Sequence, residues 1–267
     1  MAVTGPTGPQ PSAAVLRSIG SASRRTGIDF TYLLNQARTE SAFDPDAKAP
    51  TSSAAGLFQF TSQTWLATLD AHGAEHGLAW AADAIRKGPD GSYTVADAAE
   101  RQAILDLRLS PDAASAMAAE LAADNGDFLS GVLGREASAT DLSLAHFLGA
   151  EGAAKFLTAM GQNADASAAP FFPEAARANR AVFFERDGTP RTLGEIHARF
   201  ASRVAVPQSS LPPAESARPT FVLRQAFTGS SSAQPPAFRP IEQMPGHLSL
   251  EFAQAAYRRL SSLGDGA

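Results

Sequence analysis

One carboxylic acid and one amide stand at positions from which their side chains could act together on a substrate. Glu40 is predicted to end an amphipathic helix, and Gln59 follows a turn of small residues that contains Gly56. A half-buried carboxylic acid beside a neutral amide and backbone groups can protonate a glycosidic oxygen inside a sugar-binding cleft. Acid catalysis on a glycan is therefore the chemistry that these residues suggest.

The helix that carries Glu40 is predicted from its cap and its periodicity. Asp29 can cap the first turn, and Leu33, Ala37 and Glu40 recur at helical spacing on one face. The face that buries Leu33 thus turns Glu40 inward, where its carboxyl group is partly removed from water. A helix-terminal Glu can also face inward by chance, so the spacing alone leaves a catalytic and a structural interpretation open.

The remaining chain up to position 200 is predicted to be mainly helical. It is rich in alanine, has few runs of β-branched residues, and shows repeated caps and helix-breaking residues. Ser12, Ser110 and Thr140 are predicted to cap three of these helices, and residues 88–91 to form a turn between two others. The expected helices span about 12–27, 29–42, 61–77, 81–85, 94–107, 110–131, 140–149, 151–160, 173–184 and 192–200.

Two blocks of sequence resemble a known family. The first contains Glu40-Ser41-x-Phe43, an Asp-Pro turn, Ser-Ser-Ala-Ala-Gly-Leu-Phe-Gln at 52–59 and Thr-Trp at 64–65, and the second is Ala-His-Phe-Leu-Gly-Ala-Glu-Gly at 145–152. In order and spacing they resemble the soluble-type lytic transglycosylases (SLT), which share the goose-lysozyme-like fold. The second block corresponds to the family's Ala-Tyr-Asn-Ala-Gly-x-x-Gly, and its His-Phe form looks more like a branch found in phage-derived, endolysin-like proteins and their bacterial relatives.

The resemblance implies a role for each matching residue. Glu40 would be the single catalytic acid and base, cleaving between N-acetylmuramic acid and N-acetylglucosamine. Ser53 and Gln59 match positions that line the saccharide subsites, and Gly56 sits where a side chain would obstruct the loop. His146 would come near Glu40 in place of the family's tyrosine. Imidazole, unlike a phenol, can become positively charged. Two roles therefore stay open for His146, which are support of the Glu40 carboxyl group and simple packing on its helix.

The reaction type depends on a second carboxylate. Hydrolytic glycosidases generally use two, whereas a transglycosylase can use one Glu together with the sugar's own acetamido and 6-hydroxyl groups. Asp44 and Asp46 are the nearest candidates, but Asp on either side of a proline is typical of a turn. We therefore expect the single-acid route to a 1,6-anhydromuramic end. The alternatives are lysozyme-type hydrolysis and a peptidoglycan-binding assembly protein with little or no turnover.

A second motif suggests different chemistry. His72, Glu75 and His76 match the H-x-x-E-H pattern of inverted zinc peptidases. Gly73 weakens a helix at this point and Gly77 ends it, so we interpret these residues as the polar end of a helix. We accordingly expect neither a metal nor a cofactor.

Composition narrows the classes of partner. A formal net charge of −5 over 267 residues provides no basic surface for nucleic acid. The chain contains no cysteine, which excludes disulfides, thiolate nucleophiles and cysteine-based zinc sites. No stretch approaches the roughly 18 uninterrupted apolar residues of a membrane span. The expected partner is therefore the glycan strands of peptidoglycan.

Four segments are expected along the chain. Residues 1–11 are rich in Gly and Pro, are expected to be flexible, and lack the pattern of a signal peptide. Residues 12–204 would form the lysozyme-like catalytic domain. Residues 205–246, rich in Ser, Pro and Ala, would be a disordered linker, and 247–267 a C-terminal helix that could dock a protein partner. The substrate would place the enzyme in the periplasm or cell wall, by an export route that the sequence does not reveal.

Overall fold

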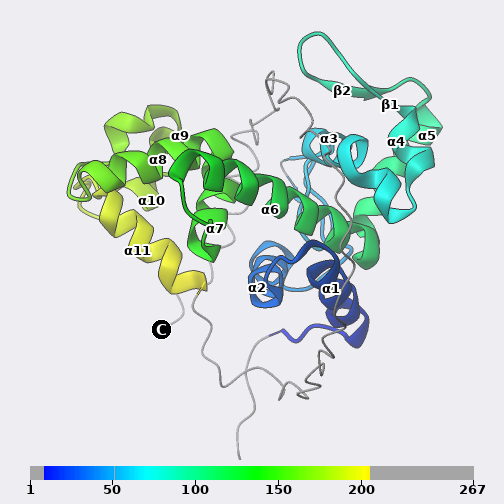
Figure 1. Cartoon of the computed structure of the whole chain (residues 1–267), viewed down its shortest axis with the longest axis horizontal. Helices are drawn as coiled ribbons and strands as arrows, with labels where there is room; N and C mark the ends of the chain where they lie inside the picture. Colours follow the sequence, from blue (N-terminus) through cyan, green and yellow to red (C-terminus); the bar gives the residue numbers. More distant parts are fainter. Residues whose placement is uncertain (1–8, 51, 205–267) are drawn as a thin grey trace, which may run out of the picture. The chain divides into compact units, whose positions relative to one another are not determined.

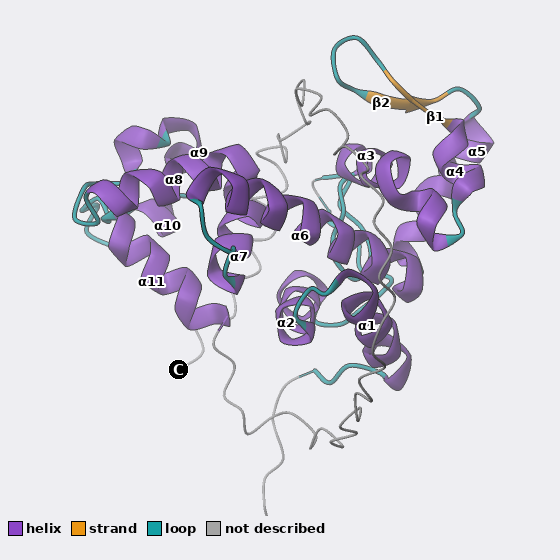
Figure 2. Ribbon diagram, in the orientation of Figure 1, coloured by secondary structure: helices purple, strands orange, loops and turns teal. Residues whose placement is uncertain are grey.

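The computed structural model describes residues 9–50 and 52–204. Over these residues the chain is mainly helical, as expected, with one two-stranded antiparallel sheet (Figure 1 and Figure 2). None of the helices in this part of the chain is both long and apolar enough to cross a membrane. The expected linker at 205–246 and C-terminal helix at 247–267 lie outside the described residues.

The elements follow in the order α1 (Ala13–Thr26), α2 (Phe30–Ser41), α3 (Ser62–His72), η1 (Gly73–His76), α4 (Ala79–Ala84), β1 (Ile85–Lys87), β2 (Tyr93–Val95), α5 (Ala98–Asp106), η2 (Leu107–Leu109), α6 (Pro111–Leu133), α7 (Ala139–Leu148), α8 (Ala150–Gln162), η3 (Ala169–Phe171), α9 (Pro173–Ala178), α10 (Arg180–Phe183) and α11 (Leu193–Val204), where η denotes a 3-10 helix.

The first two helices begin at the caps that the sequence predicts. The Ser12 side chain accepts a hydrogen bond from the backbone N–H of Val15 at 3.2 Å, and Gly27 ends α1 with a left-handed φ of 80°. The Asp29 carboxylate likewise accepts from the backbone N–H of Tyr32 at 2.8 Å. Because both helices are capped by local side chains, their positions along the chain could be predicted without tertiary information.

The start of α7 corrects one predicted cap. Ser138, and not Thr140, is the N-cap residue, and Thr140 lies inside the helix. The reason is a reciprocal pair of hydrogen bonds in which Ser138 accepts from the backbone N–H of Asp141 while Asp141 accepts from the backbone N–H of Ser138. The Asp141 carboxylate is also paired with Arg135 Nη1 at 2.6 Å. These bonds fix the beginning of the helix that carries His146.

The turn at 88–91 belongs to a β-hairpin that the sequence analysis did not predict. Strand β1 pairs with β2, with Arg86 opposite Thr94, so the helix expected to begin at Thr94 starts only after its N-cap residue, Asp97. The Gln63 side chain donates to the Tyr93 carbonyl and accepts from the Tyr93 N–H, at 3.0 and 2.8 Å. Three-residue strands are too short to show a periodicity of their own. The helix expected at 173–184 is likewise divided, into α9 and α10.

Helix α6 contributes to both hydrophobic clusters of the described region. One cluster is built on α1 to α6 together with Leu142 of α7, and the other on the C-terminal end of α6 with α7 to α11. In Figure 1, α6 runs between these two groups of helices, and it contacts α1, α3, α7 and α8. Since α2 and α7 both contact α6, this helix positions the two elements that carry Glu40 and His146.

Candidate active site

Glu40 is buried at the end of α2. Leu33 and Ala37 lie on the same face at 0% exposure, and Glu40 itself is 3% exposed. The apolar face of the helix thus carries the carboxyl group inward, as the spacing predicts. The carboxyl group of Glu40 is therefore largely removed from water.

The imidazole of His146 contacts this carboxyl group. His146 lies in the last turn of α7, and its Nε2 atom is 2.9 Å from Oε1 of Glu40. The His146 side chain is 17% exposed, whereas that of Glu40 is 4% exposed. The structure therefore brings the two blocks of sequence together at Glu40 and His146.

Tyr32 is a second neighbour of Glu40. The side chains of Tyr32, Gln36 and Glu40 follow one another at four-residue spacing on α2, and Gln36 Nε2 donates to the Tyr32 hydroxyl at 2.8 Å. Burial raises the pKa of Tyr32 above its ordinary value, and the negative charge of Glu40 raises it further. Tyr32 is therefore a neutral phenol beside the acid. Its spacing from Glu40 was a signal that sequence reasoning missed.

The turn after Glu40 is unusual in its backbone. Ala42 and Phe43 both have left-handed conformations, with φ of 52° and 68°, although neither is glycine. Ser41 Oγ lies 3.0 Å from the Ala37 carbonyl oxygen and 2.8 Å from that of Leu57. The hydroxyl next to the acid therefore joins the end of α2 to the loop at 52–60.

Gln59 and Ser53, two of the predicted substrate-binding residues, make contacts that support this loop. The Gln59 amide donates to the carbonyls of Ala47 and Gly56, at 3.0 and 2.9 Å. Ser53 Oγ accepts from the backbone N–H of Ser62, the first residue of α3, at 3.1 Å. In this structure both side chains hold the loop against its surroundings.

Gly56 faces the backbone of η2. Its φ is +81°, and a Cβ at this position would lie 1.9 Å from the carbonyl oxygen of Arg108. The Arg108 guanidinium donates to the carbonyls of Ser53 and Phe60, at 2.6 and 3.0 Å. Arg108 is 8% exposed, so the loop is held in place by a buried guanidinium group. No local pattern in the sequence indicates these partners of Arg108, which lie 55 and 48 positions away along the chain.

A small pocket adjoins His146. Its walls combine aromatic side chains with a few polar groups from α2, the 52–60 loop, α3 and α6. The lining residues are Tyr32, Gln36, Phe58, Phe60, Thr64, Ala118, Leu121, Ala122, Asn125 and His146.

The two nearest candidates for a second carboxylate lie on the surface. Asp44 and Asp46 are exposed, and Asp44 Oδ1 accepts a hydrogen bond from the Asp46 N–H at 2.9 Å. This contact is that of an Asx turn, which supports the interpretation of both residues as turn formers.

A comparison with protein families bears on the first block. Residues 17–75 match the model of the transglycosylase SLT domain, a region that contains Glu40, Ser53, Gly56 and Gln59 but not His146. The mainly helical structure is consistent with the lysozyme-like fold of that domain. Residues 17–75 are thus similar to a transglycosylase SLT domain, and this match implies peptidoglycan as substrate and transglycosylase-type cleavage as reaction.

Proposed function

We propose that the protein is a lytic transglycosylase that cleaves the β-1,4 bond between N-acetylmuramic acid and N-acetylglucosamine, with Glu40 as its only catalytic acid and base. The observation that carries the proposal is the burial of Glu40, which is 3% exposed and contacts His146. The SLT match over the surrounding residues supports the same reaction class.

In the first step, the protonated Glu40 donates its proton to the bridging oxygen as the bond from this oxygen to C1 of N-acetylmuramic acid breaks. The acetamido group of the same sugar supports the positive charge that develops at C1. In the second step the C6 hydroxyl attacks C1, and the Glu40 carboxylate takes its proton. The products are a free 4-hydroxyl on N-acetylglucosamine and a 1,6-anhydro end, with Glu40 protonated again.

His146 would act as a positioning residue in this scheme. Its Nε2 atom holds one oxygen of the Glu40 carboxyl group, and this limits rotation of the group about its side-chain bonds. Gln59, Ser53 and Gly56 would shape the saccharide subsites through the loop that they support.

We extend the proposal to the branch of the family, the location of the protein and the C-terminal segment. The His146-Phe147 pair supports a relationship to the endolysin-like branch, and the substrate supports work in the periplasm or cell wall. The C-terminal segment at 247–267 would serve to recruit a protein partner.

The test is digestion of purified peptidoglycan followed by mass spectrometry of the released muropeptides. We expect 1,6-anhydro ends from the unaltered protein, and a loss of at least about 10²-fold in the release rate for Glu40→Gln. Asp46→Asn, which neutralises an exposed acid nearby, is the matched control and should act like the unaltered protein. Reducing ends would replace the proposal with lysozyme-type hydrolysis. Binding without release would replace it with a wall-binding protein.

A further inference from the structure

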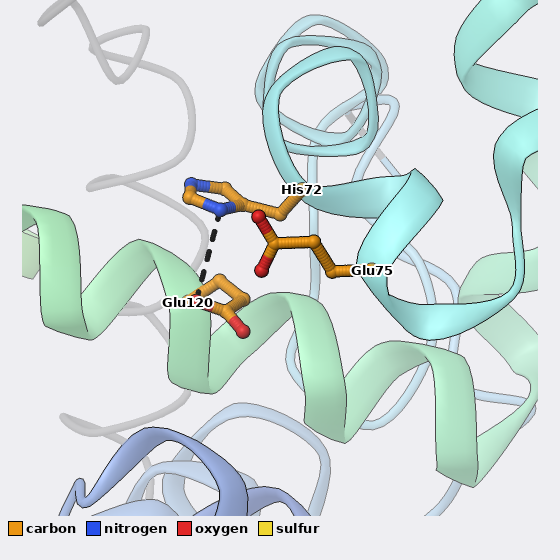
Figure 3. A group of neighbouring side chains, drawn as sticks. All are labelled: His72, Glu75 and Glu120. Carbon is orange, nitrogen blue, oxygen red and sulfur yellow. Dashed lines mark ion pairs between the residues drawn. The ribbon is translucent and has the colours of Figure 1, made fainter.

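Three potential metal ligands converge at the junction between α3 and α6. His72 ends α3, Glu75 lies in η1, and Glu120 lies within α6. One ligand atom from each of these residues lies within 4.8 Å of the other two, and His72 Nδ1 is 3.7 Å from Glu120 Oε2. Figure 3 shows the imidazole ring and both carboxylates directed toward the same space.

Two further residues orient this group from outside. Asp124 Oδ2 lies 2.9 Å from His72 Nε2, and His76 Nε2 lies 2.6 Å from Glu120 Oε1. Protein metal sites commonly have this arrangement, in which a carboxylate holds the far nitrogen of a ligating histidine and a hydrogen bond holds a ligating carboxylate. The contacts of Asp124 and His76 leave His72 Nδ1 and Glu120 Oε2 directed toward each other.

The group offers ligand atoms that a cation accepts. Glu75 and Glu120 bring two carboxylates to one imidazole. Within the described part of the chain, the Glu75 carboxylate has no hydrogen-bond or ion-pair partner, while Arg25 Nη2 holds the Glu75 backbone carbonyl at 2.7 Å. The backbone of Glu75 is therefore anchored, and its carboxylate remains available to a ligand.

We propose that His72, Glu75 and Glu120 bind one divalent transition-metal ion of the Zn²⁺ type. Imidazole and carboxylate are ligands that Zn²⁺ accepts, at about 2.0–2.2 Å, and three such ligands leave a fourth position for water. The ligand atoms, now within 4.8 Å of one another, need only small side-chain movements to reach that geometry. An ion here would join the end of α3 and η1 to α6.

This site differs from the zinc-peptidase pattern in the same residues. In that pattern His72 and His76 would both bind the metal and Glu75 would act as a general base. Here Glu75 is a ligand, and His76 contacts Glu120. Binding of the proposed ion can be measured without any assay of glycan cleavage.

The test uses the untagged full chain, treated with EDTA and then freed of it. Titration with ZnCl₂ in a calorimeter should show one ion per chain, and Zn²⁺ should raise the thermal unfolding temperature. Glu75→Gln is the decisive variant, because its side chain is exposed and its loss should leave the metal-free unfolding temperature unchanged while weakening Zn²⁺ binding at least tenfold. Asp124→Asn should weaken binding by about 10- to 100-fold through loss of the outer contact.

The controls are His197→Ala on α11 and the exposed Glu174→Gln on α9, both of which should bind Zn²⁺ as the unaltered chain does. Absence of stoichiometric binding by the unaltered chain would overturn the site and leave the residues as histidine–carboxylate hydrogen bonds. Binding that neither Glu75→Gln nor Asp124→Asn weakens would place the ion elsewhere and would equally refute the proposal.

Discussion

The Nε2 atom of His146 lies 2.9 Å from Oε1 of Glu40, although 106 positions separate the two residues in the chain. One residue ends α2 and the other lies in the last turn of α7, and both helices contact α6. The contact places an imidazole where the resemblance of the second block to the SLT family would lead us to expect a phenol.

Substitutions at His146 should separate a positioning role from simple packing. We expect His146→Ala to lower kcat by about 10- to 150-fold, with little change in KM, because a hydrogen bond to a charged group is worth about 1.5–3 kcal/mol. His146→Tyr should retain activity within about tenfold, since a phenol can make the same bond. The measurement is the rate of muropeptide release from peptidoglycan, with His197→Ala as control. A residue that only packs would change stability in the alanine variant and leave kcat unaltered.

The close approach of Gly56 to Arg108 predicts a large effect of a single methyl group. Gly56→Ala adds a Cβ 1.9 Å from the Arg108 carbonyl oxygen at a φ of +81°. We expect the free energy of unfolding to fall by at least about 3 kcal/mol, from strain and overpacking together. Gly27→Ala is the matched control, because its φ is +80° but nothing lies within 4 Å of the added atom. Gly27→Ala should lower the free energy of unfolding, measured with urea, by about 1–2 kcal/mol. Equal losses in the two variants would refute the close approach.

Asp141 predicts a dependence of stability on pH. Burial acts to raise the pKa of Asp141, but the hydrogen bonds from Arg135 and Ser138 outweigh it and hold the pKa below its ordinary value. The folded-state pKa is thus below the unfolded value of about 3.9, so the stabilisation is complete above that pH and is lost as pH falls through the folded-state pKa. Asp141→Asn should lower the free energy of unfolding by about 1–3 kcal/mol at pH 7.

The difference between Asp141→Asn and the unaltered protein should stay constant above about pH 5 and shrink below about pH 4. Chemical unfolding measured across this pH range checks the expectation. Asp127→Asn, at an exposed position on α6, supplies the control for loss of one negative charge. A difference that grew toward acid pH would show that the sign of the argument is wrong.

The extent of the folded unit can be tested by shortening the chain. Both hydrophobic clusters of the described region are built from residues between Val15 and Phe200. We expect residues 1–204 alone to unfold cooperatively, with a free energy of unfolding within about 1 kcal/mol of the full chain. Circular dichroism during urea unfolding measures both quantities. Loss of the cooperative transition would show that residues after 204 belong to the core.

Local signals in the sequence were sufficient to predict most of the helices. Ser12, Asp29 and Ser110 cap helices where expected, because a capping bond joins residues only three positions apart. The β1–β2 hairpin escaped prediction because Gln63, which holds it, is 30 residues away from Tyr93. The error at Thr140 arose from overlooking Asp141, whose side chain completes the cap of Ser138.

The candidate site was predictable only in part, because several of its contacts also join residues far apart in the chain. The inward position of Glu40 follows from the spacing of α2, since helical periodicity fixes which residues share a face. The buried Arg108 behind the loop and the contacts of Glu120 with His72 and His76 join segments far apart in the chain. No spacing within one helix encodes such pairs, and the pattern at His72 was accordingly interpreted as a polar helix end.

The bond from Ser41 to the Leu57 carbonyl has a consequence for how this protein can change over evolution. Ser41, the residue next to Glu40, is attached to Leu57 across the intervening loop, so an insertion or deletion between them would shift Glu40 itself. Side chains of this loop are therefore more readily exchanged than its length is changed. Segments such as the 88–91 turn, by contrast, can grow or shrink without disturbing the acid.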